Sequence, residues 1–167
     1  MLSSSRLQPT TSPTTDCLPR ASKLKLQSLT HSRIQVFEVE VYSLGNNVAA
    51  GKISSQSTTY KDKANFAAGS AVDGNNTTFS HTAGRDKLSW WEVDLGGMFS
   101  IESVKILNRW CQNLSDPTGC LCRLSHAAVL LFDDQHKWVH GTIIGNMCGK
   151  LVYENNFTAS AEYCMTY

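Results

Sequence analysis

Short runs in which apolar and polar residues alternate recur along most of the sequence, and they constrain the fold more than any other feature. In the segment F-E-V-E-V, Phe37, Val39 and Val41 fall on one face of an extended chain, and Glu38 and Glu40 fall on the other. A strand with one apolar face suits an antiparallel sheet that buries one side. The same alternation occurs in further runs at 23–27, 90–95, 101–107, 127–132 and 137–144.

No segment shows a sustained helical period, and turn sequences such as L-G-N-N, V-D-G-N-N and L-G-G separate the runs. Many short strands in this arrangement predict an all-β fold, an antiparallel β-sandwich. Trp91, Val93 and Leu95 alternate onto one face of their run. They are therefore predicted to lie in the core rather than on a binding surface.

The first 22 residues differ from the rest, because they are rich in Ser, Thr and Pro and nearly free of apolar residues. This composition predicts a disordered leader or linker, and it lacks the apolar stretch of roughly 7–15 residues that defines a signal peptide. Residues 23–167 have the size of one domain. No apolar run approaches the ~20 residues that a transmembrane helix needs.

The balance of charge disfavours strongly anionic partners. The chain has 15 Lys and Arg against 14 Asp and Glu, with no long run of either sign. Nucleic acids and anionic bilayers are bound by concentrated basic surfaces, so binding to either is disfavoured. An enzyme is also disfavoured, because the sequence contains no G-x-S-x-G elbow, no H-E-x-x-H pair and no phosphate-binding glycine loop.

Six cysteines and four N-x-S/T acceptor sites favour an oxidising, extracellular or secretory compartment. The acceptor asparagines are Asn75, Asn76, Asn113 and Asn156. No C-x-x-C pair is present for a zinc site, so disulfide bonds are the expected use of the cysteines. Six cysteines allow 15 pairings, and all of them stay open at this point.

Three motifs occur in a fixed order along the chain: N-V-A-A-G-K-I-S-S-Q-S-T-T-Y at 47–60, A-A-G-S-A-V-D-G-N-N-T-T-F at 67–79, and W-W-E-V-D-L-G-G-M-F-S-I-E-S-V-K-I-L-N-R at 90–109. In this order they resemble the discoidin or coagulation-factor type C domain. The resemblance covers residue 47 to about residue 133. It implies a jelly-roll β-sandwich of the galactose-binding-domain-like kind.

Within that superfamily the sequence is most similar to the fucose-binding F-type lectins. Their signature is a histidine, then an arginine, then a second arginine or a lysine after a cysteine-containing loop. His81, Arg109 and Arg123 occupy these places in this order. The loop between the two arginines is longer than the family usually has, and the adjacent cysteine pair common in the family is absent.

The chemistry of these residue types suits a sugar. Two guanidinium groups supply rigid pairs of donors for neighbouring hydroxyls, and an imidazole either donates or accepts. Trp110, next to Arg109, or the region of Cys120 and Cys122, supplies an apolar surface for one face of the ring. Each hydrogen bond contributes about 0.5–1.5 kcal/mol, so one site binds weakly. A larger or multivalent protein is therefore expected.

The turn S-A-V-D-G-N-N-T-T carries a second group of candidate residues. Calcium takes six to eight oxygen ligands from side chains and backbone at about 2.3–2.6 Å, and a tight turn with one carboxylate and several amides offers such atoms. Asp73 is the only charged residue of this turn, so a second acid has to come from elsewhere. A plain Asx-type turn without a metal is the alternative.

In F-type lectins the corresponding turn binds calcium, and the last ligands come from a glutamate near the C-terminus. The segment 23–42 resembles the final two strands of the family, which suggests a permuted register. If this segment folds back onto the same sandwich, calcium would be held by Ser70, Asp73, Asn75, Thr78, the carbonyl of Phe37 and the carboxylate of Glu38. Otherwise the segment is the tail of a preceding repeat.

Together these observations predict a module that binds glycans or glycoproteins through a fucose-like or related sugar, with a calcium-stabilised loop. One alternative is a discoidin-type adhesion module that binds protein or phospholipid. Its exposed loops would be apolar, whereas the loops here are mostly polar. A structural domain without a binding site is the remaining alternative.

Overall fold

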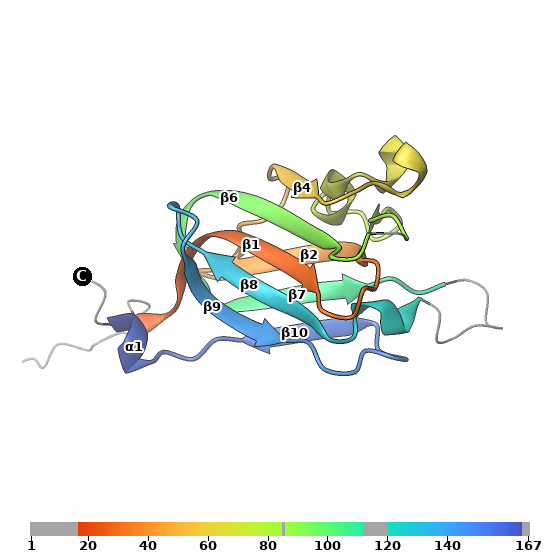
Figure 1. Cartoon of the computed structure of the whole chain (residues 1–167). Coiled ribbons are helices and arrows are strands. Elements are labelled where there is room, and N and C mark those ends of the chain that lie inside the picture. The colour runs from red at the N-terminus through yellow and green to blue at the C-terminus, as the bar shows by residue number, and fades with distance from the viewer. Residues whose placement is uncertain (1–16, 85, 112–119, 165–167) are drawn as a thin grey trace, which may run out of the picture.

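The computed structural model describes residues 17–84, 86–111 and 120–164, which form two antiparallel sheets packed as layers (Figure 1). The first sheet has the order β4 (Ser54–Gln56), β6 (Trp90–Ser100), β1 (Arg20–Ser28), β8 (Ala127–Phe132) and β9 (Trp138–Ile143). The second has the order β10 (Val152–Asn156), β7 (Ser103–Asn108), β2 (Gln35–Ser43) and β3 (Asn46–Asn47), and β5 (Ser80–His81) also pairs with β2. The predicted antiparallel β-sandwich is confirmed.

Helices are short throughout the described chain. The α-helix α1 spans Ala161–Cys164, and 3₁₀ segments occur at Tyr60–Asp62, Ala64–Phe66, Ala68–Ala71 and Leu121–Leu124. Among residues 17–84, 86–111 and 120–164, no helix has both the length and the apolar character that crossing a membrane requires.

Both strands of the segment 23–42 pair within this sandwich, as the fold-back hypothesis requires. Strand β1 lies between β6 and β8, and β2 lies beside β7. Strand β1 begins at Arg20, earlier than the predicted domain boundary, because Ala21 and Ser22 are already buried in the sandwich. Residues 20–22, predicted as part of the leader, therefore belong to the domain, and residues 1–16 lie outside the described part.

The core between the sheets contains the side chains that the alternation of β6 predicted. Trp91, Val93 and Leu95 are fully buried there. The indole nitrogen of Trp91 donates a hydrogen bond of 3.0 Å to the carbonyl of Ala68. Ala68 begins the 3₁₀ segment just before the Asp73 turn, so the core supports the segment that leads into that turn.

A β-bulge corrects the prediction for one residue of β2. The pairing of β2 with β7 shifts register between Val36 and Glu38, so Phe37 does not alternate with Val39 as the sequence pattern implied. Val36, Val39 and Val41 belong to the core, whereas Phe37 lines a surface pocket. A β-bulge changes the direction in which the side chains of a strand point, and bulges are frequent where a strand borders a functional site.

All six cysteines form disulfide bonds, as expected for an oxidising compartment. The Cys111–Cys120 bond closes a loop after β7. The Cys122–Cys148 bond joins the 3₁₀ segment Leu121–Leu124 to the segment after β9. The third, Cys17–Cys164, joins the residues before β1 to helix α1 at the other end of the sandwich (Figure 1).

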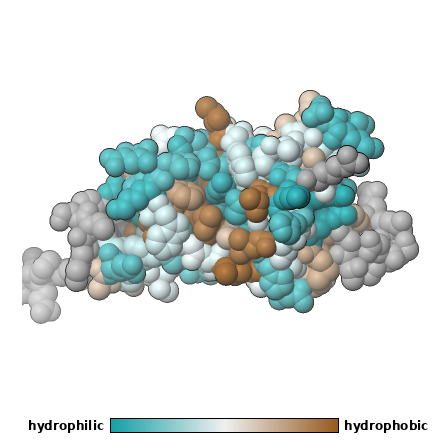
Figure 2. Space-filling model, in the orientation of Figure 1, coloured by the Kyte–Doolittle hydropathy of each residue, from teal (hydrophilic) through white to brown (hydrophobic). Residues whose placement is uncertain are grey.

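On the face of the molecule shown in Figure 2, hydrophilic side chains cover most of the surface and apolar ones form small separate areas. The most exposed large apolar residues of the described chain include Ile53, Leu44 and Ile143. This face therefore offers no extended apolar surface for insertion into a membrane.

Candidate functional site

Three of the four residues predicted to bind the sugar, His81, Arg109 and Arg123, line one pocket. His81 lies on β5, Arg109 directly follows β7, and Arg123 lies on the 3₁₀ segment Leu121–Leu124. The pocket has a volume of about 270 Å³. Its other lining residues are Arg33, Tyr60, Phe66, Cys111 and Cys120. Side chains far apart in the sequence therefore converge at one end of the sandwich.

Gln35, the first residue of β2, holds the two arginines beside each other. Its buried side-chain oxygen accepts a hydrogen bond of 3.1 Å from Nη1 of Arg109 and one of 2.5 Å from Nη1 of Arg123. Burial lowers the pKa of Arg109, and the neighbouring charge of Arg123 lowers it further. The guanidinium groups are thus held in place before any ligand arrives, which reduces the entropy lost on binding.

His81 is held as a neutral ring with one nitrogen left for a ligand. It is 4% exposed, and its ring centroid lies 4.3 Å from that of Tyr60. Nδ1 donates a hydrogen bond of 2.7 Å to the carbonyl of Thr82, so Nε2 carries the lone pair. Burial lowers the pKa of His81 to about 4, and the charges of Arg109, Arg33 and Arg123 lower it too, against the bond to Thr82.

The structure adds two residues to this site that the sequence pattern did not identify. Gln35 lies in a predicted strand and carries no signal of its own, because only the fold brings it under both arginines. Arg33 lies in the loop between β1 and β2, and its guanidinium sits against Gly84. A side chain at position 84 would press on this guanidinium, so Arg33 would have to shift to make room for it.

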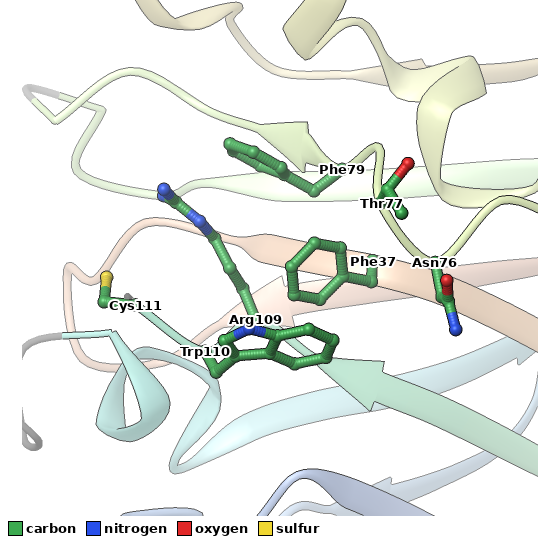
Figure 3. Close-up of a pocket in the computed structure, with 7 residues that line it drawn as sticks. All are labelled: Phe37, Asn76, Thr77, Phe79, Arg109, Trp110 and Cys111. Atoms are coloured by element: carbon green, nitrogen blue, oxygen red, sulfur yellow. The ribbon is translucent and has the colours of Figure 1, made fainter. Parts of the chain in front are cut away.

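Trp110 lies in a second pocket beside the first one (Figure 3). This pocket has a volume of about 650 Å³ and is lined by Phe37, Asn76, Thr77, Phe79, Arg109, Trp110 and Cys111. The Trp110 ring lies 4.3 Å from that of Phe37, and Cζ of Arg109 lies 3.9 Å from the centre of the Phe79 ring. Arg109 and Cys111 line both pockets, whereas Trp110 lines only the second.

The Asp73 turn brings together four of the six residues predicted to hold calcium. The amide of Asn75 donates to both Oδ1 of Asp73 and Oε1 of Glu38, each at 2.9 Å. The hydroxyl of Thr78 donates to Oδ2 of Asp73 at 2.7 Å. Carboxylates from β2 and from the turn therefore meet at one backbone amide.

The remaining two predicted ligands lie next to this network in the chain. Ser70 lies on the 3₁₀ segment before the turn, and its amide donates to the carbonyl of Ala67. Phe37 precedes Glu38 and turns its ring into the second pocket. Within residues 17–84, 86–111 and 120–164, no side-chain hydrogen bond connects either residue to the network around Asp73.

The two carboxyl groups differ in their protonation. Burial raises the pKa of Glu38 to about 7, and its contact with Asp73 adds to the rise. Burial alone would raise the pKa of Asp73, but hydrogen bonds from Thr78 and Asn75 hold it below its ordinary value. A proton on Glu38 thus relieves the repulsion between the pair, and a cation bound to both carboxylates would do the same. These oxygen donors fit calcium.

Comparison with known proteins gives two matches. A model of the F5/F8 type C family, described as the NedA-like, galactose-binding domain, matches residues 70–164. Among solved structures, a histidine mutant of the lectin binding domain of lectinolysin, complexed with Lewis b, is 29% identical in sequence and superposes with a TM-score of 0.51. The likeness covers 71% of this chain and 80% of that chain. The comparison with curated proteins gives no match.

Proposed function

This chain belongs to the F5/F8 type C family of galactose-binding domains, and from that premise we propose that it is a lectin module of the F-type that binds fucose or a related sugar. Its family and its structural neighbour, a lectin binding domain, support carbohydrate binding in general. The observation that carries the finer proposal is the convergence of His81, Arg109 and Arg123 in one pocket.

The pocket has the groups that a single sugar ring needs. Arg109 and Arg123 present donors to neighbouring hydroxyls, and the unprotonated Nε2 of His81 accepts from another hydroxyl. Tyr60 and Phe66 pack around His81 and offer apolar surface to the carbon skeleton of the sugar. These residues bind and orient a ligand, and the proposal assigns no chemical step to any of them.

A calcium ion is part of the proposal. Asp73, Glu38, Asn75 and Thr78 would hold it, together with Ser70 and the carbonyl of Phe37. The ion would neutralise the facing carboxylates and fix the turn that leads into β5, the strand that carries His81. Its role is to brace the loop.

Three disulfide bonds and a lectin-like domain support an extracellular location. We extend this to a secreted module whose partners are glycans or glycoproteins.

A glycan array probed with the purified protein tests the sugar proposal. Binding is expected to concentrate on glycans that carry fucose, and it should weaken when a chelator removes calcium. Absence of binding to every glycan on the array, by a protein whose circular dichroism shows a folded β-structure, would count against the lectin function.

Calcium is expected to raise the melting temperature of the protein. A ligand that binds only the folded state stabilises it in proportion to the logarithm of its concentration, so calcium at about 100 times its dissociation constant should raise Tm by about 5–10 °C. Asp73→Asn should remove this rise, because it removes one of two ligand charges. The matched control is Asp134→Asn, an exposed acid in the turn after β8, which should keep it. Equal melting curves in calcium and in chelator would favour the plain Asx-type turn.

A further inference from the structure

The pocket that contains Trp110 is contiguous with the proposed sugar pocket. Arg109 and Cys111 line both, so the two pockets adjoin each other at these residues. Figure 3 shows the side chain of Arg109 extending toward Phe79, with the rings of Phe37 and Trp110 grouped beside it. The bulge in β2 makes this arrangement possible, because it turns Phe37 out of the core.

The second pocket combines an aromatic surface with polar groups at its edge. Trp110 keeps 38% of its surface exposed even though its ring packs on Phe37. Asn76 and Thr77, from the turn after Asp73, supply an amide and a hydroxyl to the same pocket. A sugar ring has one face of C–H groups that packs on an aromatic ring and hydroxyls at its rim that bond to such polar groups.

We infer that this second pocket binds the next sugar ring of an oligosaccharide whose terminal ring occupies the pocket of His81, Arg109 and Arg123. The inference rests on the proposed function and extends it from a monosaccharide to an oligosaccharide. Trp110 is the residue that sets this preference: it stacks on the second ring and does not touch the first. The ligand is thus a glycan of at least two rings, and free monosaccharide is a weaker one.

The test compares L-fucose with the Lewis b oligosaccharide, which contains fucose, by isothermal titration calorimetry. The full chain is made in a host without N-glycosylation, because Asn76 begins an N-T-T acceptor sequence at the pocket. Trp110→Ala is expected to weaken binding of Lewis b by about tenfold, which is about 1.4 kcal/mol, and to leave binding of L-fucose within about twofold. Trp110→Phe keeps an aromatic ring and should retain most of the affinity.

The matched control is Trp138→Ala, which removes an exposed tryptophan of β9 outside both pockets. It should change the binding of neither ligand. Equal affinity of the wild-type protein for L-fucose and Lewis b, or an unchanged affinity of Trp110→Ala for Lewis b, would overturn the second pocket. Equal losses for both ligands in Trp110→Ala would also overturn it, by placing Trp110 at the first ring. Failure of the wild-type protein to bind either ligand would instead refute the fucose proposal.

Discussion

Replacing Arg109 with alanine is expected to weaken sugar binding by about ten- to hundredfold while the fold persists. A hydrogen bond from a charged donor contributes about 1.5–3 kcal/mol, and every 1.4 kcal/mol is a factor of ten in Kd. The fold should tolerate the change, because Gln35 keeps its bond to Arg123 and the lost contact with the Phe79 ring contributes only about 0.5–2 kcal/mol. Calorimetry with the best glycan of the array measures the loss, and thermal melting measures the stability.

Two variants make this result specific. Arg109→Lys should restore little of the affinity, because one ammonium group cannot reproduce the fork of donors of a guanidinium. Arg20→Ala changes the first residue of β1, which lines neither pocket, and should bind as the wild type does. Full binding by Arg109→Ala would show that the sugar lies elsewhere, and the adhesion alternative would then become the better explanation.

Replacing Trp91 with alanine is expected to lower the free energy of unfolding by about 3–5 kcal/mol, the usual cost of removing a large buried aromatic side chain. Trp91 is fully buried, and its indole nitrogen is bonded to the carbonyl of Ala68. Because this bond supports the segment that leads to the Asp73 turn, the calcium-dependent rise in melting temperature should also diminish. Urea denaturation in calcium and in chelator measures both effects.

Trp138→Ala is again the matched control, because Trp138 keeps 59% of its surface exposed and its removal leaves no cavity in the core. Its effect on the free energy of unfolding should be about 0.5 kcal/mol or less. A loss as small as this in Trp91→Ala would contradict the central place of Trp91 in the core.

The sandwich could be predicted from the sequence because its long strands alternate. In β6, for example, Trp91, Val93 and Leu95 point to one side in a simple period of two. The alternation fails at the bulge of β2, since an extra residue that no local pattern marks reverses the side on which Phe37 lies. Strand β10 was not predicted, because it is an edge strand whose apolar residue Val152 is exposed.

The candidate site was predictable where residue type and order carried the information. His81, Arg109 and Arg123 follow a family signature, and the structure places all three in one pocket. Gln35 and Arg33 carry no such signal, because their places depend on how the start of β2 meets the end of β7. Trp110 is next to Arg109 in the sequence, but the sequence alone does not show which pocket Trp110 lines. Its packing on Phe37 in the fold places it in the adjoining pocket.

The Cys17–Cys164 bond determines how this module can be attached to something else. It joins the two flanks of the domain to each other at the end where β1 begins, whereas β7 finishes at the other end (Figure 1). Arg109, which lines both pockets, directly follows β7. A stalk, a surface or another domain joined to either flank would therefore be attached at the end of the sandwich opposite the pockets. Such an attachment would leave the pockets open to a ligand. Force applied between the two flanks would pass through the disulfide bond and would not be carried by β1 and its hydrogen bonds.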